Sequence, residues 1–327
     1  MKKALSVGIN YAGTGNDLKG CINDSNNMKA MLEGRGFEVK LVLEKEATTQ
    51  GIKDALEWLV AGTVPGDVIV FHYSGHGSQI PSKAESDGFE EIICPIDLNW
   101  RDKIITDDTL RQIFDKVPNG VNVTVFLDCC HSGTMLDQTQ STVVATKGLE
   151  AGKVVTKSRN LSKKKGSRYL KPPVSVLKKL KDKELVNWAA TKDVNATAML
   201  IAACRADQTS ADATISGIFQ GAGTASLLKS VNANPNITYK QLVDEMNNFM
   251  VSNRFTQRPE LDGSFGLHNE VFLSTWTMFM PPVVEPEIPQ MLQVPVVARS
   301  AKEKKDNTTK IAIVAGIALI VFFAFFA

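Results

Sequence analysis

Two short polar segments carry the residues whose side chains could do chemistry. The first, DCCHSG at residues 128–133, directly follows the apolar segment 121–127, which is rich in β-branched residues and predicts a buried strand. The second contains His76, which lies between two glycines just after another apolar segment, 68–73. Reactive groups in open α/β sheets gather outside the carboxyl ends of the strands. If the two predicted strands are parallel neighbours, His76 and a cysteine meet at one edge of the sheet.

A thiol beside an imidazole is equipped for nucleophilic attack on a carbonyl carbon. A free thiol is only a few per cent ionised at neutral pH, and a neighbouring imidazole activates it. Cys130 and His76 form this pair, although two adjacent cysteines also fit a buried core position. His72 and His131 are the alternative bases. We interpret His72 as structural because it lies inside the strand pattern, whereas the His131 side chain should diverge from its cysteine neighbour.

The motifs HYSGHG at 72–77 and DCCHSG at 128–133 resemble those of the metacaspases, the caspase-like cysteine peptidases of clan CD. The resemblance extends roughly over residues 3–275. It implies a caspase-like α/β fold with an open, mostly parallel sheet sandwiched between helices. It also implies a catalytic dyad of His76 and Cys130.

The same resemblance argues against Cys129 as the nucleophile. Backbone amides should stabilise the oxyanion of an acyl-transfer reaction, and we expect those of Gly77 and Cys130 to do so. Monomer is the expected state, because metacaspases are generally not dimers.

Asp128 indicates the substrate that the site prefers. It lies two residues before Cys130, so both side chains lie on the same side of the strand end. Its carboxylate could cap a neighbouring helix or loop, or it could receive a cation from the substrate in a charge-assisted pair. The resemblance implies cleavage after Arg or Lys, with an acidic primary pocket at positions Cys21, Asp24, Ser74 and Asp128. A caspase-type preference for Asp would require arginines there, and none of the four is arginine.

Calcium is the expected cofactor. Acidic residues from separate loops offer the oxygen ligands that a hard cation prefers, although they also fit surface positions and a helix cap. By the resemblance, the candidate ligands are Glu90, Glu91, Asp107, Asp108 and Asp137. Metacaspase ligands are mainly Asp, so the glutamates are a departure from the family pattern.

A basic segment separates the two halves of the expected catalytic region. Lys and Arg crowd residues 147–183, where hydrophobic periodicity is poor, which indicates an exposed insertion. A solvated loop and a contact with acidic lipids are alternative interpretations. The resemblance implies self-cleavage there, and the expected processing sites are Lys157, Arg159, Lys163, Lys164, Lys165 and Arg168.

Composition and the chain ends set further limits. The 327 residues are 43% hydrophobic, enough for a substantial core, and the net charge of +2 demands no nucleic-acid partner. Residue Met1 leads directly into a predicted strand, so we expect no secretory signal, and we expect a type I-like member of the family without a long N-terminal prodomain. Five cysteines without metal-pair spacing indicate free thiols in a reducing compartment.

The C-terminal segment 311–327 has no charged or strongly polar residue and is at the short limit for a membrane-spanning helix. Lysines precede it, which favours a single-pass tail anchor with the catalytic domain in the cytoplasm. The expected organisation is a peptidase domain at 1–280, divided into a large-subunit-like region 1–136, a processing loop 137–195 and a small-subunit-like region 196–280, followed by a Pro/Lys-rich linker 281–310 and the anchor 311–327.

Alternating strand and helix patterns predict the parallel sheet. The expected strands are 4–9, 37–43, 68–73, a short one within 86–97, 121–127, 196–203 and 270–276. The expected helices are 23–36, 48–61 with Thr48 as cap, one opening at 105–108 with Thr106 or Asp107 as cap, 221–230 and 238–252, and the segment 257–263 is expected to be a loop.

These patterns lead to one preferred function and its alternatives. The preferred function is a membrane-tethered cysteine endopeptidase that is specific for Arg or Lys, activated by calcium and self-processing. A catalytically silent membrane scaffold is the rival, although such a protein has no need to keep both His76 and Cys130. A nucleic-acid binder is disfavoured because the basic segment lacks interleaved aromatic residues.

Overall fold

The computed structural model describes residues 1–82, 89–130, 167–174, 177, 198–205 and 208–276. All of them belong to one compact unit, Met1–Phe279. The predicted linker and membrane anchor, and most of the predicted processing loop, lie outside the described residues.

The centre of the protein is a six-stranded sheet in the order β11-β8-β7-β3-β1-β2. Its strands are β1 (Lys2–Gly8), β2 (Glu38–Leu43), β3 (Val68–Ser74), β7 (Asn122–Asp128), β8 (Ala198–Ala202) and β11 (Glu260–Gly263). All neighbours pair in parallel except β11, which is antiparallel to β8. β3 and β7 are buried along their whole length, as expected for central parallel strands covered on both faces. This confirms the predicted open, mostly parallel sheet.

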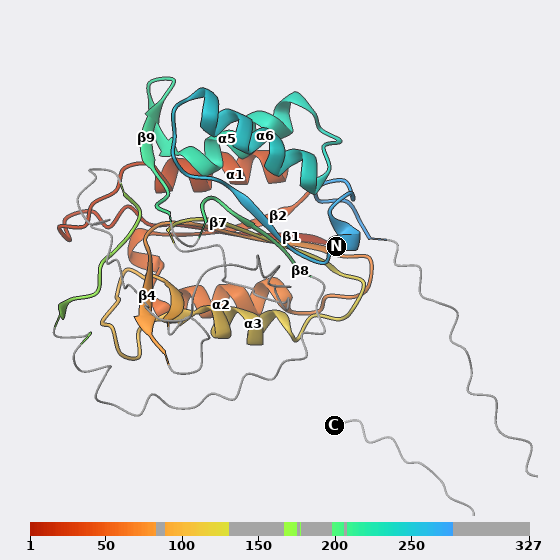
Figure 1. Ribbon diagram of the computed structural model, residues 1–327. Coiled ribbons are helices and arrows are strands. Elements are labelled where there is room, and N and C mark those ends of the chain that lie inside the picture. Colours follow the sequence, from red (N-terminus) through yellow and green to blue (C-terminus); the bar gives the residue numbers. More distant parts are fainter. Residues whose placement is uncertain (83–88, 131–166, 175–176, 178–197, 206–207, 277–327) are drawn as a thin grey trace, which may run out of the picture. The chain divides into compact units, whose positions relative to one another are not determined.

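Helices cover both faces of the sheet (Figure 1). α1 (Cys21–Glu33), α5 (Ala222–Ala233) and α6 (Tyr239–Ser252) lie on one face, and α2 (Thr49–Val60) and α3 (Asp107–Phe114) lie on the other. A separate cluster of buried apolar side chains fills the space under each layer. Three helices begin at threonine caps, because the side chains of Thr48, Thr106 and Thr238 accept hydrogen bonds from backbone amides of the first turn.

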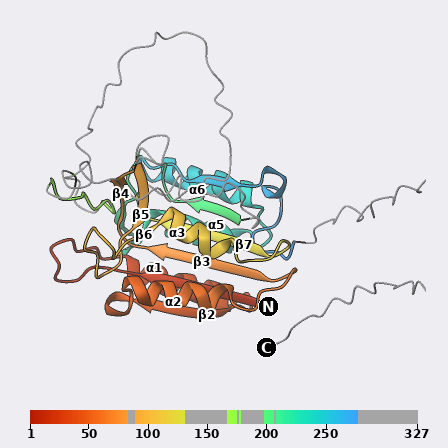
Figure 2. The same ribbon diagram turned by 90° about the horizontal axis from the view of Figure 1, so that it is seen from below.

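Two small sheets lie at the end of the molecule where β3 and β7 terminate (Figures 1 and 2). One contains β4 (Gly77–Pro81), β5 (Phe89–Ile93) and β6 (Ile105–Thr106), and the other is the hairpin of β9 (Asp212–Ile215) and β10 (Ile218–Gly221). Short 3-10 helices occupy Glu44–Glu46 and Phe265–Leu267. The sequence patterns predicted β5, but they predicted neither β4 nor the hairpin.

Most predicted elements are confirmed to within a few residues, and three predictions need correction. The segment 270–276 is not a strand, because the Leu273 backbone has φ 62° and its neighbours pack as irregular chain against the helices. The predicted loop 257–263 contains strand β11. Helix α1 begins at Cys21 rather than residue 23 and ends at Glu33. No helix in the described part of the chain is long and apolar enough to cross a membrane.

Candidate active site

The register of the two central strands brings the predicted dyad to one edge of the sheet. β3 and β7 pair in parallel with Ser74 opposite Asp128. His76 and Cys130 each follow two residues later, so the polar segments leave the sheet side by side. A Cβ on Gly77 would lie 2.0 Å from the Cys130 carbonyl oxygen, which shows how closely the two segments approach. Only glycine permits this approach.

The His76 imidazole is buried and held from several sides. Its Nε2 atom lies 2.7 Å from the backbone oxygen of Asn16, and its ring packs on the Tyr11 ring at a centroid distance of 4.7 Å. The hydroxyls of Tyr11 and Tyr73 bond the backbone N–H and carbonyl of His76. Nδ1 is buried without a hydrogen-bond partner among the described residues. Burial lowers the pKa of His76, which the carbonyls of Asn16 and Arg168 partly oppose, so the imidazole can accept a proton at neutral pH.

The two adjacent cysteines have different surroundings. The Cys130 sulfur accepts a hydrogen bond from the Ser210 backbone N–H at 3.1 Å. Cys129 instead belongs to the core cluster on the α2 and α3 face, and burial raises the pKa of its thiol well above the ordinary value. His72 is also structural in its contacts. It is fully buried inside β3, its Nδ1 lies 2.7 Å from the Ser6 hydroxyl, and burial lowers its pKa to about 3.

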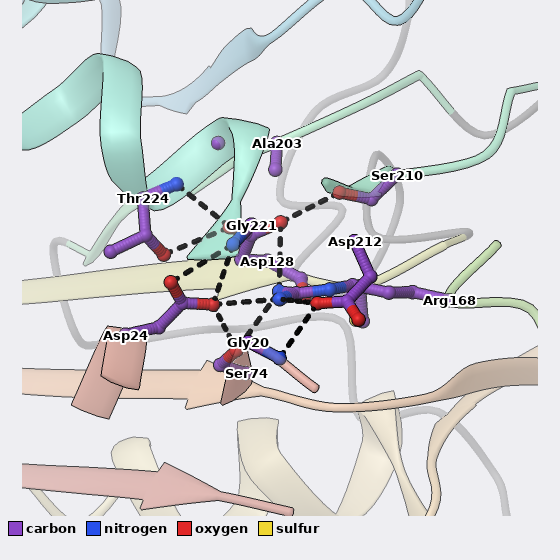
Figure 3. A network of polar contacts seen from close by, with 12 residues as sticks. Gly20, Asp24, Ser74, Asp128, Arg168, Ala203, Ser210, Asp212, Gly221 and Thr224 are labelled. Carbon is purple, nitrogen blue, oxygen red and sulfur yellow. Dashed lines mark hydrogen bonds and ion pairs between the residues drawn. The ribbon is translucent and has the colours of Figure 1, made fainter. Parts of the chain in front are cut away.

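The predicted acidic pocket contains an arginine from the chain itself (Figure 3). The Arg168 side chain is fully buried, and its guanidinium lies 2.7 Å from Asp24, 3.2 Å from Asp128 and 3.1 Å from Asp212. It also donates to the Ser74 hydroxyl at 2.9 Å. One cation therefore faces three carboxylates, and the pocket as a whole keeps an excess of negative charge.

Helix α5 fixes the two innermost carboxylates from the opposite side. The Gly221 N–H donates to both oxygens of Asp24 at 2.9 and 3.0 Å. The N–H and hydroxyl of Thr224 donate to Asp128 at 2.7 and 2.8 Å, and the Ser210 hydroxyl donates to it at 2.6 Å. Asp128 therefore accepts hydrogen bonds at the start of a neighbouring helix, as one interpretation expected, and it also faces a cation of the same chain; its pairing with a substrate cation stays a prediction. The positive end of the helix dipole adds to the stabilisation of the two carboxylates.

Burial dominates the electrostatics of the pocket. It raises the pKa of Asp24 to about 6, although the Arg168 charge acts in the opposite direction. The surrounding carboxylates raise the pKa of Arg168 above its ordinary value in spite of its burial. Cys21, the fourth predicted pocket residue, is fully buried. Burial raises the pKa of its thiol, and the Arg168 charge offsets only part of that rise.

The backbone N–H and carbonyl of Arg168 are both hydrogen-bonded to neighbouring segments. Its carbonyl accepts a hydrogen bond from the Gly77 N–H at 2.9 Å, and its N–H donates to the Ser210 carbonyl at 3.1 Å. Ser210 thus contacts both Arg168 and the Cys130 sulfur. Two backbone amides, those of Gly77 and Cys130, were predicted to stabilise the oxyanion. The Gly77 amide donates to this carbonyl, and the oxyanion role of both amides stays a prediction.

Sequence reasoning missed Asp212. It is the first residue of β9, and besides Arg168 it accepts hydrogen bonds from the backbone N–H groups of Lys19 and Gly20 at 2.8 and 3.0 Å. The available signal was its position in the polar segment 204–212, which follows the buried strand β8. An acidic residue after a central strand is a candidate for the same edge of the sheet.

The predicted calcium ligands lie on different elements. Glu91 is in the middle of β5, Asp107 is the first residue of α3, and both are buried. Asp108 forms an ion pair with Arg111 instead. Glu90 is half-buried, and Asp137 lies outside the described residues. Within the described ranges, no group of three or more His, Cys, Asp or Glu side chains is arranged to hold a metal ion.

Of the predicted processing residues, Arg168 alone falls in the described part of the chain. Lys157, Arg159, Lys163, Lys164 and Lys165 lie outside it, as does His131.

The comparisons with known proteins identify relatives of this chain. A family model described as metacaspase, peptidase C14 domain, matches residues 2–139. Metacaspase-1 of Lodderomyces elongisporus is 35% identical over 300 residues, covering 80% of this chain and 65% of that protein. Metacaspase-1 of Mycosarcoma maydis is 33% identical over 283 residues, covering 80% and 70%. A crystal structure of a Geobacter sulfurreducens protein matches with a TM-score of 0.58 and 26% identity, covering 84% of this chain and 99% of that one.

The relatives and the family model define the class of protein that this chain resembles, the metacaspases of the peptidase C14 type. The chain belongs to the metacaspase family. It spans about two thirds of the length of the curated relatives it matches.

Proposed function

We propose that the protein is an endopeptidase that cleaves peptide bonds after Arg or Lys through the dyad of His76 and Cys130. The observation that supports this most strongly is Arg168, whose side chain fills the acidic pocket while its carbonyl accepts a hydrogen bond from Gly77. A substrate arginine in the same pose would present its carbonyl carbon beside the nucleophile. The arrangement therefore resembles an enzyme–substrate complex formed within one chain.

The proposed reaction has two steps. His76 accepts the thiol proton, and the Cys130 sulfur attacks the carbonyl carbon of the arginine. The Gly77 N–H stabilises the oxyanion that forms, as preorganised backbone donors do in acyl transfer. The peptide bond then breaks, His76 gives its proton to the leaving amine, and a water molecule hydrolyses the thioester to release the acid and the thiol. The Asn16 oxygen holds Nε2 and so leaves Nδ1 to carry the proton.

The pocket favours Arg over Lys. Both terminal guanidinium nitrogens of Arg168 are used, one toward Asp24 and Asp212 and the other toward Ser74 and Asp128. A planar guanidinium matches such a spread of acceptors, whereas an ammonium is a single point charge with a shorter reach. Lysine substrates should therefore be cleaved more slowly than arginine substrates.

The bond after Arg168 is the proposed self-processing site. Of the basic residues expected to be cut, it is the one that the structure describes, and it is seated in the pocket. Glu91 and Asp107, with Asp137, are the proposed calcium ligands, because their carboxylates are hard oxygen donors and the first two are buried acids on elements that follow each other across the β5–β6 pairing. Calcium would offset the mutual repulsion of these acids and so stabilise the β5–β6 region near the dyad. Self-cleavage is proposed to depend on it.

A peptide panel tests the specificity. The cleavage rates of fluorogenic Arg, Lys, citrulline and Asp peptides are measured with and without calcium. The rate should be highest for the Arg peptide, lower for the Lys peptide and lowest for the citrulline and Asp peptides. Cys130→Ala should abolish cleavage, and Cys129→Ala should leave most of it. Preference for the Asp peptide, or full activity of Cys130→Ala, would contradict the proposal.

Mass spectrometry of the full chain tests the processing site. With millimolar calcium, the wild type should be cut after Arg168, Arg168→Gln should lose that cut, and the matched control Arg159→Gln should keep it. Fragments from Cys130→Ala that equal those of the wild type would assign the cut to another protease. Retention of the cut at this bond in Arg168→Gln would refute recognition by the acidic pocket.

Two readouts separate calcium binding from activity. Calcium should raise the unfolding temperature of the inactive Cys130→Ala chain, and adding Glu91→Gln should abolish that rise. Equal rises with and without Glu91→Gln would refute this ligand assignment.

The apolar segment 311–327 supports a further part of the proposal, a single-pass tail anchor that leaves the peptidase domain in the cytoplasm. Removing this segment should move the protein from the membrane fraction to the supernatant with its peptidase activity intact. A distribution that the truncation leaves unchanged would refute the anchor.

A further inference from the structure

The chain continues past Arg168 in an ordered path over the other side of the scissile bond. Tyr169 forms a parallel β-bridge with Gly77, and the Leu170 N–H donates to the Gly77 carbonyl at 3.1 Å. The Ser78 hydroxyl then donates to the Leu170 carbonyl at 2.6 Å. On the other flank, Ser167 forms an antiparallel bridge with Ala211. The segment therefore lies as an added strand between β4 and the start of β9, which is how many proteins bind extended peptides.

The Leu170 side chain has an apolar environment. It is half-buried and packs against the core cluster on the α2 and α3 face of the sheet, to which Ile80, Ile92 and Cys94 belong. The next residue, Lys171, is exposed. Along this segment, the second position after the arginine thus combines two hydrogen-bonded backbone groups with an apolar contact. A charged side chain there would lose its hydration against the cluster.

We propose that the enzyme recognises its substrates on both sides of the cleaved bond, through a subsite for the second residue after the arginine that accepts a large aliphatic side chain. Gly77 and Ser78 hold the backbone of that residue, and the core cluster receives its side chain. Gly77 then has two functions, since its N–H faces the carbonyl that reacts and its C=O orients the leaving half of the peptide. Ser78 is a positioning residue. This inference rests on the proposed function, because it takes Arg168 as the residue before the cleaved bond.

Internally quenched peptides built on residues 167–172, SRYLKP, test the subsite on the full-length chain. The leucine is kept or replaced by Met, Ala or Asp, and a short Arg amide with a fluorogenic leaving group reports cleavage without any residue beyond the bond. We expect Leu and Met peptides to be cleaved with similar kcat/KM and the Asp peptide about tenfold more slowly or worse, in line with losing a half-buried apolar contact. Mass spectrometry verifies that each peptide is cut after its arginine.

The variant Ser78→Ala tests the backbone contact. We expect the ratio of kcat/KM for the Leu peptide to that for the short amide to fall about fivefold or more, as loss of one hydrogen bond predicts. Ser230→Ala is the matched control, because Ser230 is also buried and donates to a backbone carbonyl, but within helix α5. It should keep the wild-type ratio. Unfolding temperatures of both variants show whether either change acts through the fold.

The outcomes separate the subsite from the function on which it rests. Equal cleavage of the Leu and Asp peptides after arginine would overturn the subsite and leave the proposed function intact. So would a Ser78→Ala variant that slows the short amide and the long peptide by the same factor. If every arginine substrate stayed uncut, the proposed function would fail, and the subsite with it.

Discussion

The substitution Asp24→Asn measures how much the buried acid contributes to arginine recognition. Asp24 is fully buried, lies 2.7 Å from the Arg168 guanidinium and accepts from the Ser74 hydroxyl at 2.7 Å. Truncating one partner of a buried, hydrogen-bonded charge pair costs about 2–5 kcal/mol. Asparagine keeps one acceptor oxygen, and Asp128 and Asp212 remain charged, so we expect the lower part of that range, about 2–3.5 kcal/mol. The specificity for arginine should then fall by about 30- to 400-fold in kcat/KM.

The assay compares two peptides of nearly the same shape, one with arginine and one with citrulline before the cleaved bond, which differ in charge and in one terminal donor group. The ratio of their kcat/KM values is the readout, because competition from Arg168 and the fraction of active enzyme affect both peptides equally. Asp54→Asn is the matched control, since Asp54 is an exposed acid on α2 that accepts a hydrogen bond from Gln50. It should leave the ratio unchanged. An Asp24→Asn variant that folds normally and keeps the full arginine-to-citrulline ratio would refute the pocket assignment.

Three further predictions follow from other contacts. A Cβ on Gly221 would lie 2.2 Å from an Asp128 oxygen, so Gly221→Ala should obstruct the pocket and raise KM for arginine peptides. Gly266→Ala, whose Cβ meets no atom within 4 Å, should behave as wild type in the same kinetic assay. Burial raises the pKa of Asp24 to about 6 while the Arg168 guanidinium occupies the pocket and acts to lower it. In a pocket without that cation the pKa is higher still, so KM for the arginine peptide should rise as the pH falls toward about 6. A parallel rise for the citrulline peptide would assign the titration to another group. Thr238→Ala removes the hydroxyl that accepts the Gln241 N–H in the capping box of α6 and keeps the bond from its own backbone N–H to the Gln241 side chain. It should lower the unfolding free energy by about 1 kcal/mol, measured by urea denaturation, and an unchanged midpoint would show that the hydroxyl cap contributes nothing.

The central strands were predictable because their apolar residues are continuous. Strands β3 and β7 are buried at every position, so no competing pattern obscures them. The segment 270–276 is equally apolar, yet it is irregular because its side chains fill a gap beside the helices. Apolar composition alone cannot distinguish these two ways of burying a chain. The hairpin β9–β10 has exposed apolar residues and a tight turn at Ser216 and Gly217, both with positive φ, so its pattern resembles neither a core strand nor a helix.

The site was predictable where it follows the strands and unpredictable where distant segments meet. His76, Asp128 and Cys130 follow buried strands, so their meeting was inferable from parallel pairing. Asp212 accepts a hydrogen bond from the Lys19 N–H, although the two residues are 193 positions apart in the sequence. No local pattern encodes such a contact.

The sequence could not predict which basic residue occupies the pocket, again because the answer depends on contacts between distant segments. Several lysines and arginines of the insertion have equal charge and similar neighbours in the sequence. Arg168 enters the pocket because residues 167–170 pair with β4 on one flank and with Ala211 on the other. That pairing is a tertiary property, which the sequence pattern does not show.

The two sets of contacts that Asp128 makes limit how the proposed arginine specificity could be redesigned. A variant meant to accept acidic residues would need a positive or neutral pocket, and Asp128 is the obvious position to change. Its carboxylate, however, also receives the N–H and hydroxyl of Thr224 at the start of α5, so a replacement without an acceptor oxygen leaves that helix end unsatisfied. Asp212 carries a similar constraint, because it accepts the backbone N–H groups of Lys19 and Gly20 besides facing Arg168. A change of charge at either acid therefore also acts on the fold.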